Sequence, residues 1–348
     1  MKWHQCPHSS NAAAEEWARR QLLHQWIDLA LQRYGFAAQN LQLIAGEASH
    51  RRYYRVWSAK RRKAFVIMDA VPSLEDNVAF VTIANLLASA RVRVPAIYEW
   101  DKANGFLLLE DVGTETLLHL NLRARSETVR PYYFQAVDTL IDMQLNAQAS
   151  ELATFSSETM RAELDLFTDW YLARHLKTKL TSKQQRELSS FFDLIAERNH
   201  MPKQVFVHRD FRPGNLAISE DGNTMAVLDF QDATKGPLTY DLVSLLWDAF
   251  HCWDTQFTQQ IVSYYWVTAI RKGLPVPSTL TAFDTSLYWT RLQRHVRVIG
   301  IFTRLALRDG KKKYLGEIAR FNKYIISSTT TKDSARPLLQ LLDSINTY

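Results

Sequence analysis

A histidine, two aspartates and an asparagine occur in this sequence at spacings that suit phosphoryl transfer. The apolar stretch Val205–Val207 leads into His208 and Asp210, Asn215 comes five positions after Asp210, and Asp229 follows the next apolar stretch. Phosphoryl transfer needs an acceptor hydroxyl held in line and a divalent cation that screens the phosphates. We predict that Asp210 accepts the hydroxyl proton. Asn215 and Asp229 are predicted to supply the hard oxygen ligands that Mg²⁺ prefers.

The order of these residues matches the protein-kinase pattern H-R-D-x-x-x-x-N followed by D-F-G, with Gln231 in place of the glycine. Single acidic residues in turns are common, but here they occur together with strands and a hairpin through 221–223, in the expected order. His208 is predicted to pack or hydrogen-bond within the loop. Asp241 is predicted either to cap the helix that follows it or to tie down the loop.

The elements that must position these residues fall into two groups. Short apolar and aromatic runs predict strands in the first 112 residues, and helical spacing predicts two helices there. The strands are expected at 41–44, 53–57, 64–69, 95–100 and 106–110, and the helices at 13–34 and 75–90. Helices dominate afterwards, at 130–148, 158–177, 182–199, 239–251, 255–272, 281–305 and 314–327, with strand-like pieces at 204–207, 216–219 and 225–229. This order predicts an α+β, two-lobed protein-kinase-like fold. Its N-terminal lobe, 1–112, would hold a mixed β sheet with a helix, and its helical C-terminal lobe, 113–348, the catalytic loop.

Composition excludes several other classes of protein. The 348 residues are 47% hydrophobic and 22% charged, as in globular proteins, and they show no sustained heptads. The net charge of +6 favours an anionic ligand such as a nucleotide. No apolar run approaches the roughly 20 residues of a membrane span. Cys6 and Cys252 lack zinc-ligand spacing, so we expect neither a disulfide framework nor a zinc site. The expected location is the reducing cytoplasm, and the expected oligomeric state is a monomer. Basic runs at 51–55 and 60–63 carry no RNA-binding motif, so nucleic acid is not an expected partner.

The catalytic segment, His208–Asn215, resembles the H-x-D-x-x-x-x-N loop of the aminoglycoside phosphotransferases and choline kinases, which share the protein-kinase fold. Further blocks across residues 40–325 resemble one branch, the AmgK-type kinases of bacterial cell-wall amino sugars. These blocks are Ala48–Val56, Val66–Ala70, Phe106–Asp111, Asp169–Leu176, Leu228–Ala233, Gly236–Ser244 and Gln293–Phe302.

This resemblance implies a reaction. Kinases of this branch use ATP to phosphorylate the anomeric hydroxyl of N-acetylmuramate and N-acetylglucosamine to the α-1-phosphate, and a uridylyltransferase then makes the UDP-sugar during peptidoglycan recycling. ATP and Mg²⁺ are the implied cofactors, bound between the lobes. An anomeric hydroxyl is more acidic than an ordinary alcohol, which makes proton removal by Asp210 easier.

The resemblance also implies where the nucleotide contacts lie. Gly46–Arg51 falls where kinases carry their phosphate loop, so backbone N–H groups, Ser49 and Arg51 are expected to contact phosphate; an ordinary charged hairpin is the alternative. The carbonyl of Glu110 and the amide of Val112 are expected to pair with adenine. Met68 occupies the third-strand position at which kinases usually have lysine. The phosphate cation therefore stays unassigned among Arg51, Arg52 and Lys63.

An amino-sugar acceptor needs groups that bind hydroxyls and, for muramate, a cation for the lactyl carboxylate. The helical half offers Glu163, Arg174 and Arg294 for these roles. Two alternatives stay open. The chain could phosphorylate an aminoglycoside or another small hydroxyl compound, although the mixed charges of this half fit a neutral or anionic sugar better. It could instead be a nucleotide-binding pseudokinase, which Met68 and the glycine-poor loop would favour.

Overall fold

The computed structural model describes residues 8–36, 41–45, 50–200, 203–329 and 335–345 of the chain. The residues divide by their contacts into two compact units. The first unit consists of Met1–Asn85 with Val94–Gly113, and the second of Leu86–Arg93 with Thr114–Tyr348. The predicted catalytic and metal-binding residues belong to the second unit, and the predicted nucleotide contacts to the first.

Five strands form the sheet of the first unit, in the order β1-β2-β3-β5-β4. They are β1 (Gln42–Ala45), β2 (Arg52–Ser58), β3 (Lys63–Asp69), β4 (Ile97–Asp101) and β5 (Phe106–Glu110), all close to the predicted positions. The expectation of a mixed sheet is wrong, because every pairing between these described strands is antiparallel. Short connections reverse the chain from β2 to β3 and from β4 to β5. At the last reversal Gly105 has φ +72°, and a Cβ there would collide with the carbonyl oxygen of Ala70.

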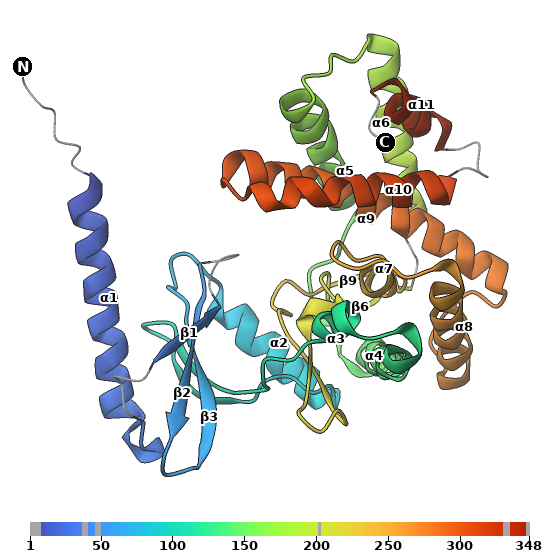
Figure 1. Cartoon of the computed structure of the whole chain (residues 1–348). Helices are drawn as coiled ribbons and strands as arrows, with labels where there is room; N and C mark the ends of the chain where they lie inside the picture. Colours follow the sequence, from blue (N-terminus) through green and yellow to red (C-terminus); the bar gives the residue numbers. More distant parts are fainter. Residues whose placement is uncertain (1–7, 37–40, 46–49, 201–202, 330–334, 346–348) are drawn as a thin grey trace, which may run out of the picture. The chain divides into compact units, whose positions relative to one another are not determined.

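Helix α1 (His8–Ala30) covers one part of this sheet, and Figure 1 shows it running alongside the strands. Leu23 and Ile27 of this helix and Leu31, just beyond its last residue, recur every four positions and therefore point to the same side. That face packs into one buried core with Phe65 and Phe106. A 3₁₀ turn, η1 (Gln32–Tyr34), follows, and α2 (Asn77–Ser89) lies in the chain between β3 and β4.

The second unit is mainly helical (Figure 1). Its helices are α3 (Leu117–Arg123), α4 (Ser126–Asn146), α5 (Ser157–Leu166), α6 (Ser182–Asn199), α7 (Tyr240–Leu246), α8 (Thr255–Lys272), α9 (Leu280–Arg308), α10 (Ile318–Thr329) and α11 (Arg336–Ser344), with 3₁₀ segments η3 (Ala149–Glu151), η5 (Pro213–Asn215) and η6 (Lys312–Glu317). Helices α5, α6, α9, α10 and α11 contribute buried side chains to one large hydrophobic core. Side-chain caps define several ends: at α6, Thr181 and Gln184 form a reciprocal capping box.

Some elements differ from the prediction. The helix expected over 158–177 is α5 followed by a π-helix, η4 (Phe167–His175). Gly300 of α9 packs against this junction, where a Cβ would lie 2.5 Å from the carbonyl carbon of Leu166. The helix expected over 239–251 ends at Leu246, and α3, α11 and one short strand were not predicted. No helix among the described residues is both long and apolar enough to span a bilayer.

Four three-residue strands frame the predicted catalytic loop. Strand β6 (Val205–Val207) pairs antiparallel with β9 (Thr234–Gly236), and β7 (Leu216–Ile218) pairs antiparallel with β8 (Met225–Val227). The loop therefore leaves one buried strand, passes through η5 and enters a hairpin. Asp229 follows two residues after this hairpin, so strand pairing returns it to the neighbourhood of Asn215.

Candidate active site

His208 is locked inside the loop as a neutral ring. It is fully buried, and burial lowers its pKa. Its Nδ1 accepts the backbone N–H of Asp210 at 3.2 Å, and its Nε2 lies 3.0 Å from the carbonyl oxygen of Leu228. A neutral imidazole protonated on Nε2 satisfies both contacts. His208 therefore organises the loop, as predicted.

Asp241, the second residue of α7, holds the start of this loop. One carboxylate oxygen accepts the backbone N–H of His208 at 2.6 Å, and the other accepts that of Arg209 at 3.0 Å. Arg209 has φ +75°, which a residue with a side chain adopts at a cost unless its surroundings impose it. Of the two roles predicted for Asp241, capping a helix or tying down the loop, the structure shows the second.

Two side chains donate hydrogen bonds to the carboxylate of Asp210. Arg212 Nε donates to its Oδ2 at 2.9 Å, and Asn215 Nδ2 donates to Oδ2 and to the Asp210 carbonyl oxygen, each at 2.9 Å. Burial by itself would raise the pKa of Asp210, but the charges of Arg212 and Arg294 outweigh it and hold the pKa below its usual range. Asp210 is therefore ionised at neutral pH and able to accept a proton.

Asn215 and Asp229 lie together, with 3.5 Å between Asn215 Nδ2 and Asp229 Oδ2. Because the Asn215 amide nitrogen is engaged by Asp210, its side-chain oxygen is left as the metal-binding atom. Asp229 has φ +61°, and Gln231 donates to its Oδ1 at 3.0 Å. One carboxylate and one amide oxygen fit Mg²⁺, which usually binds one or two carboxylates together with substrate phosphates and water. The described residues hold no cluster of three His, Cys, Asp or Glu, which an all-protein metal cage would need.

Glu163 is the centre of a charged network beside the loop. Its Oε1 accepts a hydrogen bond from Arg209, and its Oε2 accepts one from Gln293 at 3.1 Å and pairs with Arg297 Nε at 2.9 Å. The carboxylate thus joins α5 and α9 to the catalytic loop. Arg209 also lies over the ring of Phe155, 4.6 Å from its centroid.

The other two predicted acceptor residues have different surroundings. Arg294 on α9 is 4% exposed and donates one long hydrogen bond, 3.4 Å, to the Trp247 carbonyl oxygen. In the described part of the chain, no carboxylate forms an ion pair with it. Arg174 is exposed on η4 and stacks on Trp170 at 3.9 Å, and no hydrogen bond within the described ranges joins it to Asp210.

In the first unit, Arg51 and Glu75 form a nearly buried ion pair, with 3.0 Å between Nη2 and Oε2. The other Glu75 oxygen accepts the backbone N–H of His50 at 3.0 Å, so Glu75 holds the chain just before β2. Ser49 lies outside the described residues. Arg52 is paired with Glu16 of α1 at 2.8 Å.

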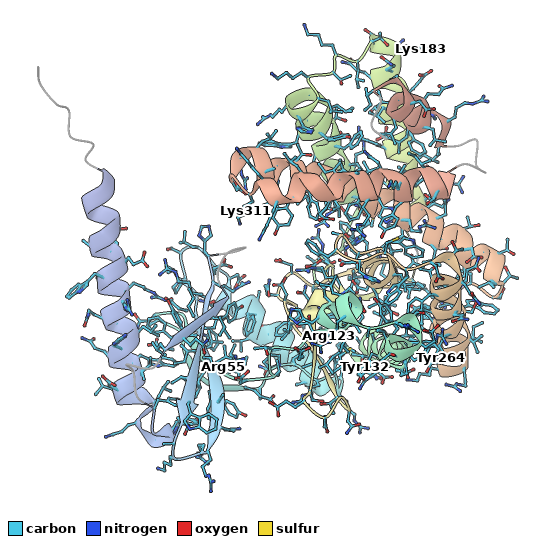
Figure 2. The ribbon with its side chains drawn as sticks, viewed as in Figure 1. Arg55, Arg123, Tyr132, Lys183, Tyr264 and Lys311 are labelled. Atoms are coloured by element: carbon cyan, nitrogen blue, oxygen red, sulfur yellow. The ribbon has the colours of Figure 1, made fainter. Side chains whose placement is uncertain are left out.

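The segment predicted to bind adenine is tied to the sheet. The Glu110 amide donates to the Ala96 carbonyl oxygen at 2.8 Å, which keeps this end of β5 in the sheet. Arg55 of β2, labelled in Figure 2, donates to both carboxylate oxygens of Asp111 at 2.5 and 2.9 Å. The residues on either side of Asp111, Glu110 and Val112, are thus positioned by strand pairing and by a bidentate ion pair.

A profile described as "Phosphotransferase enzyme family" matches residues 40–274, which is more than half of the sequence. The chain belongs to this phosphotransferase family. The N-acetylmuramate/N-acetylglucosamine kinase of Pseudomonas aeruginosa is 38% identical to this phosphotransferase and aligns with 94% of this chain and 97% of its own. The enzyme of the same name from Neisseria meningitidis is 36% identical and aligns with 87% and 90%. The family predicted from the motifs is confirmed.

A solved structure extends the likeness to the fold. The ethanolamine kinase of Plasmodium vivax superposes on this phosphotransferase with a TM-score of 0.64 at 11% identity, over 94% of this chain and 90% of that one. The predicted kinase-like α+β fold is thereby confirmed. As a kinase-family enzyme, the phosphotransferase uses ATP and a hydroxyl acceptor.

The structure of the phosphotransferase also brings forward two residues that the motifs did not single out. Arg212 contacts Asp210 directly. Its position two residues after the aspartate was the feature of the sequence that could have indicated this contact. Asp248 follows Trp247, is 3% exposed and accepts the Phe250 amide at 3.1 Å. Burial raises the pKa of Asp248 above its ordinary value, although the charges of Arg212 and Arg294 act in the opposite direction.

Proposed function

We propose that this phosphotransferase transfers the terminal phosphoryl group of ATP to the anomeric hydroxyl of N-acetylmuramate or N-acetylglucosamine. The product would be the α-1-phosphate, formed during peptidoglycan recycling. The observation that carries the proposal is the clustering of Asp210, Asn215 and Asp229 in a chain that aligns almost end to end with kinases of that name.

Asp210 takes the proton of the acceptor hydroxyl as its oxygen attacks phosphorus. The new O–P bond forms while the bond from phosphorus to the bridging oxygen breaks, and ADP leaves with that electron pair. Asn215 orients the base through its amide, and with Asp229 it would hold Mg²⁺. When bound, Mg²⁺ screens the negative charge of the phosphates.

The remaining predicted contacts form part of the same proposal. In the first unit, Arg51 and Ser49 would contact phosphate, and the Glu110 carbonyl and Val112 amide would pair with adenine. In the second unit, Arg294 would bind the lactyl carboxylate of N-acetylmuramate, because it is a buried cation without a carboxylate partner among the described residues.

Glu163 and Arg174 would have different roles at the acceptor site. Glu163 would position the acceptor site through Arg209, because both of its oxygens already accept donors from the protein. Arg174 would contact the sugar at the edge of the site, where its exposed side chain is free to leave Trp170. In that position it would contribute less than Arg294.

The decisive experiment is ³¹P NMR of the purified protein with ATP, Mg²⁺ and N-acetylmuramate, with N-acetylglucosamine and kanamycin in parallel. We expect a sugar-1-phosphate with α-type coupling, absent when EDTA removes Mg²⁺ and absent for Asp210→Asn. Product with kanamycin alone would indicate that the protein is an aminoglycoside kinase. ATP binding without any product would favour the pseudokinase.

A further inference from the structure

Three arginines follow one another at three-residue intervals on α9, and they differ in how their charges are neutralised. Arg297 pairs with Glu163 at 2.9 Å. In the part of the chain that the structure describes, neither Arg291 nor Arg294 forms an ion pair with a carboxylate. Residues three apart are neighbours on the surface of a helix, so two cations without an acidic partner lie next to each other on α9.

Arg291 carries its charge in largely apolar surroundings. Its guanidinium carbon lies 4.2 Å from the centroid of the Trp247 ring, a cation–π contact. Its Nε is buried and makes no hydrogen bond to any described residue. Burial lowers the pKa of Arg291 to about 10, and the one described group that acts against this effect is Tyr324, a phenol whose pKa burial raises. An enclosed cation with no anion beside it is costly, so an anionic ligand would stabilise it.

Arg294 reaches the same tryptophan from the next turn of α9. Its Nη1 donates to the Trp247 carbonyl oxygen at 3.4 Å, and its Nε has no hydrogen-bond partner within the described ranges. Burial lowers the pKa of Arg294, although interactions with Tyr240 and Asp210 act in the opposite direction. Trp247 therefore has one guanidinium over its ring and another at its carbonyl oxygen.

His295 indicates that the two arginines act at the same place. The imidazole is fully buried, and neither ring nitrogen has a hydrogen-bond partner among the residues described. Burial lowers the pKa of His295 well below its ordinary value, and the positive charges of Arg291 and Arg294 lower it further. The ring therefore stays neutral, and the positive charge at this point of α9 belongs to the two arginines.

We propose that Arg291 and Arg294 together form a clamp for the lactyl carboxylate of N-acetylmuramate. The inference rests on the proposed function and extends it, because it adds Arg291 to the acceptor site. Each guanidinium presents a fixed fork of donors that matches the two oxygens of a carboxylate. Arg294 connects the clamp to the reacting centre, because its charge also acts on the base Asp210.

The clamp would select the acceptor without taking part in phosphoryl transfer. The lactyl ether is carried by C3 of the sugar and the reacting hydroxyl by C1, so the bound carboxylate lies beside the attacking oxygen. Both arginines keep their protons throughout. N-acetylglucosamine has no lactyl group and leaves both cations without an anion. A purely structural Arg291, which only supports the Trp247 ring, would affect the two sugars equally.

The test compares three acceptors in the wild type and in Arg291→Met: N-acetylmuramate, its methyl ester and N-acetylglucosamine. The ester keeps the lactyl group but removes its charge, so the wild type should already prefer the acid to the ester. In Arg291→Met we expect kcat/KM for N-acetylmuramate to fall about 10- to 100-fold, mainly through KM, as for loss of a hydrogen bond to a charged group. The two uncharged acceptors should change little. Arg291→Lys keeps the charge and should lose less than Arg291→Met.

The matched control is Arg308→Met, since Arg308 is an exposed arginine at the end of the same helix and pairs with Asp309 at 2.6 Å. This control should keep the wild-type kcat/KM for all three acceptors. Equal losses of Arg291→Met with all three acceptors would overturn the inference, and so would a wild type that uses the methyl ester as well as the acid. Absence of turnover in the wild type with every acceptor would instead refute the proposed function.

Discussion

The Asp241 carboxylate accepts the backbone N–H of His208 at 2.6 Å inside a fully buried environment. Its other oxygen accepts the next N–H along the chain, that of Arg209. A carboxylate can satisfy two converging N–H groups, whereas an amide offers one oxygen and one competing donor. The shape of the catalytic loop therefore depends on an acid at position 241, and not merely on a polar residue.

Replacing Asp241 with Asn should accordingly distort the loop. One loop N–H would face the Asn amide nitrogen, so Asp210 would move from its productive place, and a displacement of about 1 Å can cost on the order of 10² in rate. We expect kcat to fall by that order at pH 8, above the Asp241 pKa of about 7, while ADP binding, measured calorimetrically, stays close to wild type. Unchanged kcat would show that the loop does not need this acid.

The same residue makes stability depend on pH. Burial raises the pKa of Asp241 to about 7, although the N–H groups of His208 and Arg209 act in the opposite direction. Between the ordinary Asp pKa and about 7, the folded state holds a proton that the unfolded state has released. The Asp241 contribution to the free energy of unfolding therefore falls as pH rises through this window. Urea titrations at pH 4.5 and 7 should show this fall in the wild type relative to Asp241→Asn. The same change in the free energy of unfolding between these pH values in both proteins would contradict it.

Asp210→Asn is the direct test of the base. The substitution keeps the size of the side chain and its contact with Arg212, but removes the proton acceptor. We expect kcat to fall about 10²- to 10⁴-fold, the range that general bases contribute, with an unchanged melting temperature and ADP affinity. A variant that retained full turnover would show that another group takes the proton.

Much of this site could be predicted because it is local in sequence. Asp210 and Asn215 are five residues apart and Asp229 follows a short hairpin, so spacing alone indicated their clustering. The hydrogen bonds among the three now supply the geometry. The strands of the first unit were likewise predicted from short periodic runs, whereas the sheet, expected to be mixed, is antiparallel in every pairing of its described strands.

Long-range contacts explain what the sequence did not indicate. Strand β9 has three residues, and it exists because Gly236 pairs with Val205 across the loop. Glu163 is 46 residues from Arg209 and 130 from Gln293, and no spacing rule connects such positions. Contacts of this kind depend on how helices pack, which a single sequence does not encode in any local pattern.

Arg294 offers a test of acceptor selectivity. N-acetylmuramate carries a lactyl carboxylate that N-acetylglucosamine lacks, so the two sugars differ in the group that a buried arginine would bind. A hydrogen bond to a charged group contributes about 1.5–3 kcal/mol, so Arg294→Met should lower kcat/KM for N-acetylmuramate about 10- to 100-fold more than for N-acetylglucosamine. The uncharged sugar is the matched control. Equal losses with both sugars would mean that Arg294 supports the loop and does not read the carboxylate.

Gly300 provides a stability test in the core of the second unit. A Cβ at this position would lie 2.5 Å from the carbonyl carbon of Leu166 and 2.6 Å from the amide nitrogen of Phe167, both of them backbone atoms that cannot rotate away. Gly300→Ala should therefore force α9 away from the junction of α5 and η4. Overpacking of this kind costs about 1–3 kcal/mol in the free energy of unfolding.

Gly316 in η6 is the matched control for this substitution, because a Cβ there would meet no atom within 4 Å. Gly316→Ala should leave the urea midpoint close to wild type, while Gly300→Ala lowers it. Movement of α9 would also stretch the contacts of Glu163 with Gln293 and Arg297, so Gly300→Ala should lose some kcat even well below its melting temperature. If both variants unfolded at the wild-type midpoint, the close approach of α9 to η4 would not be required for stability.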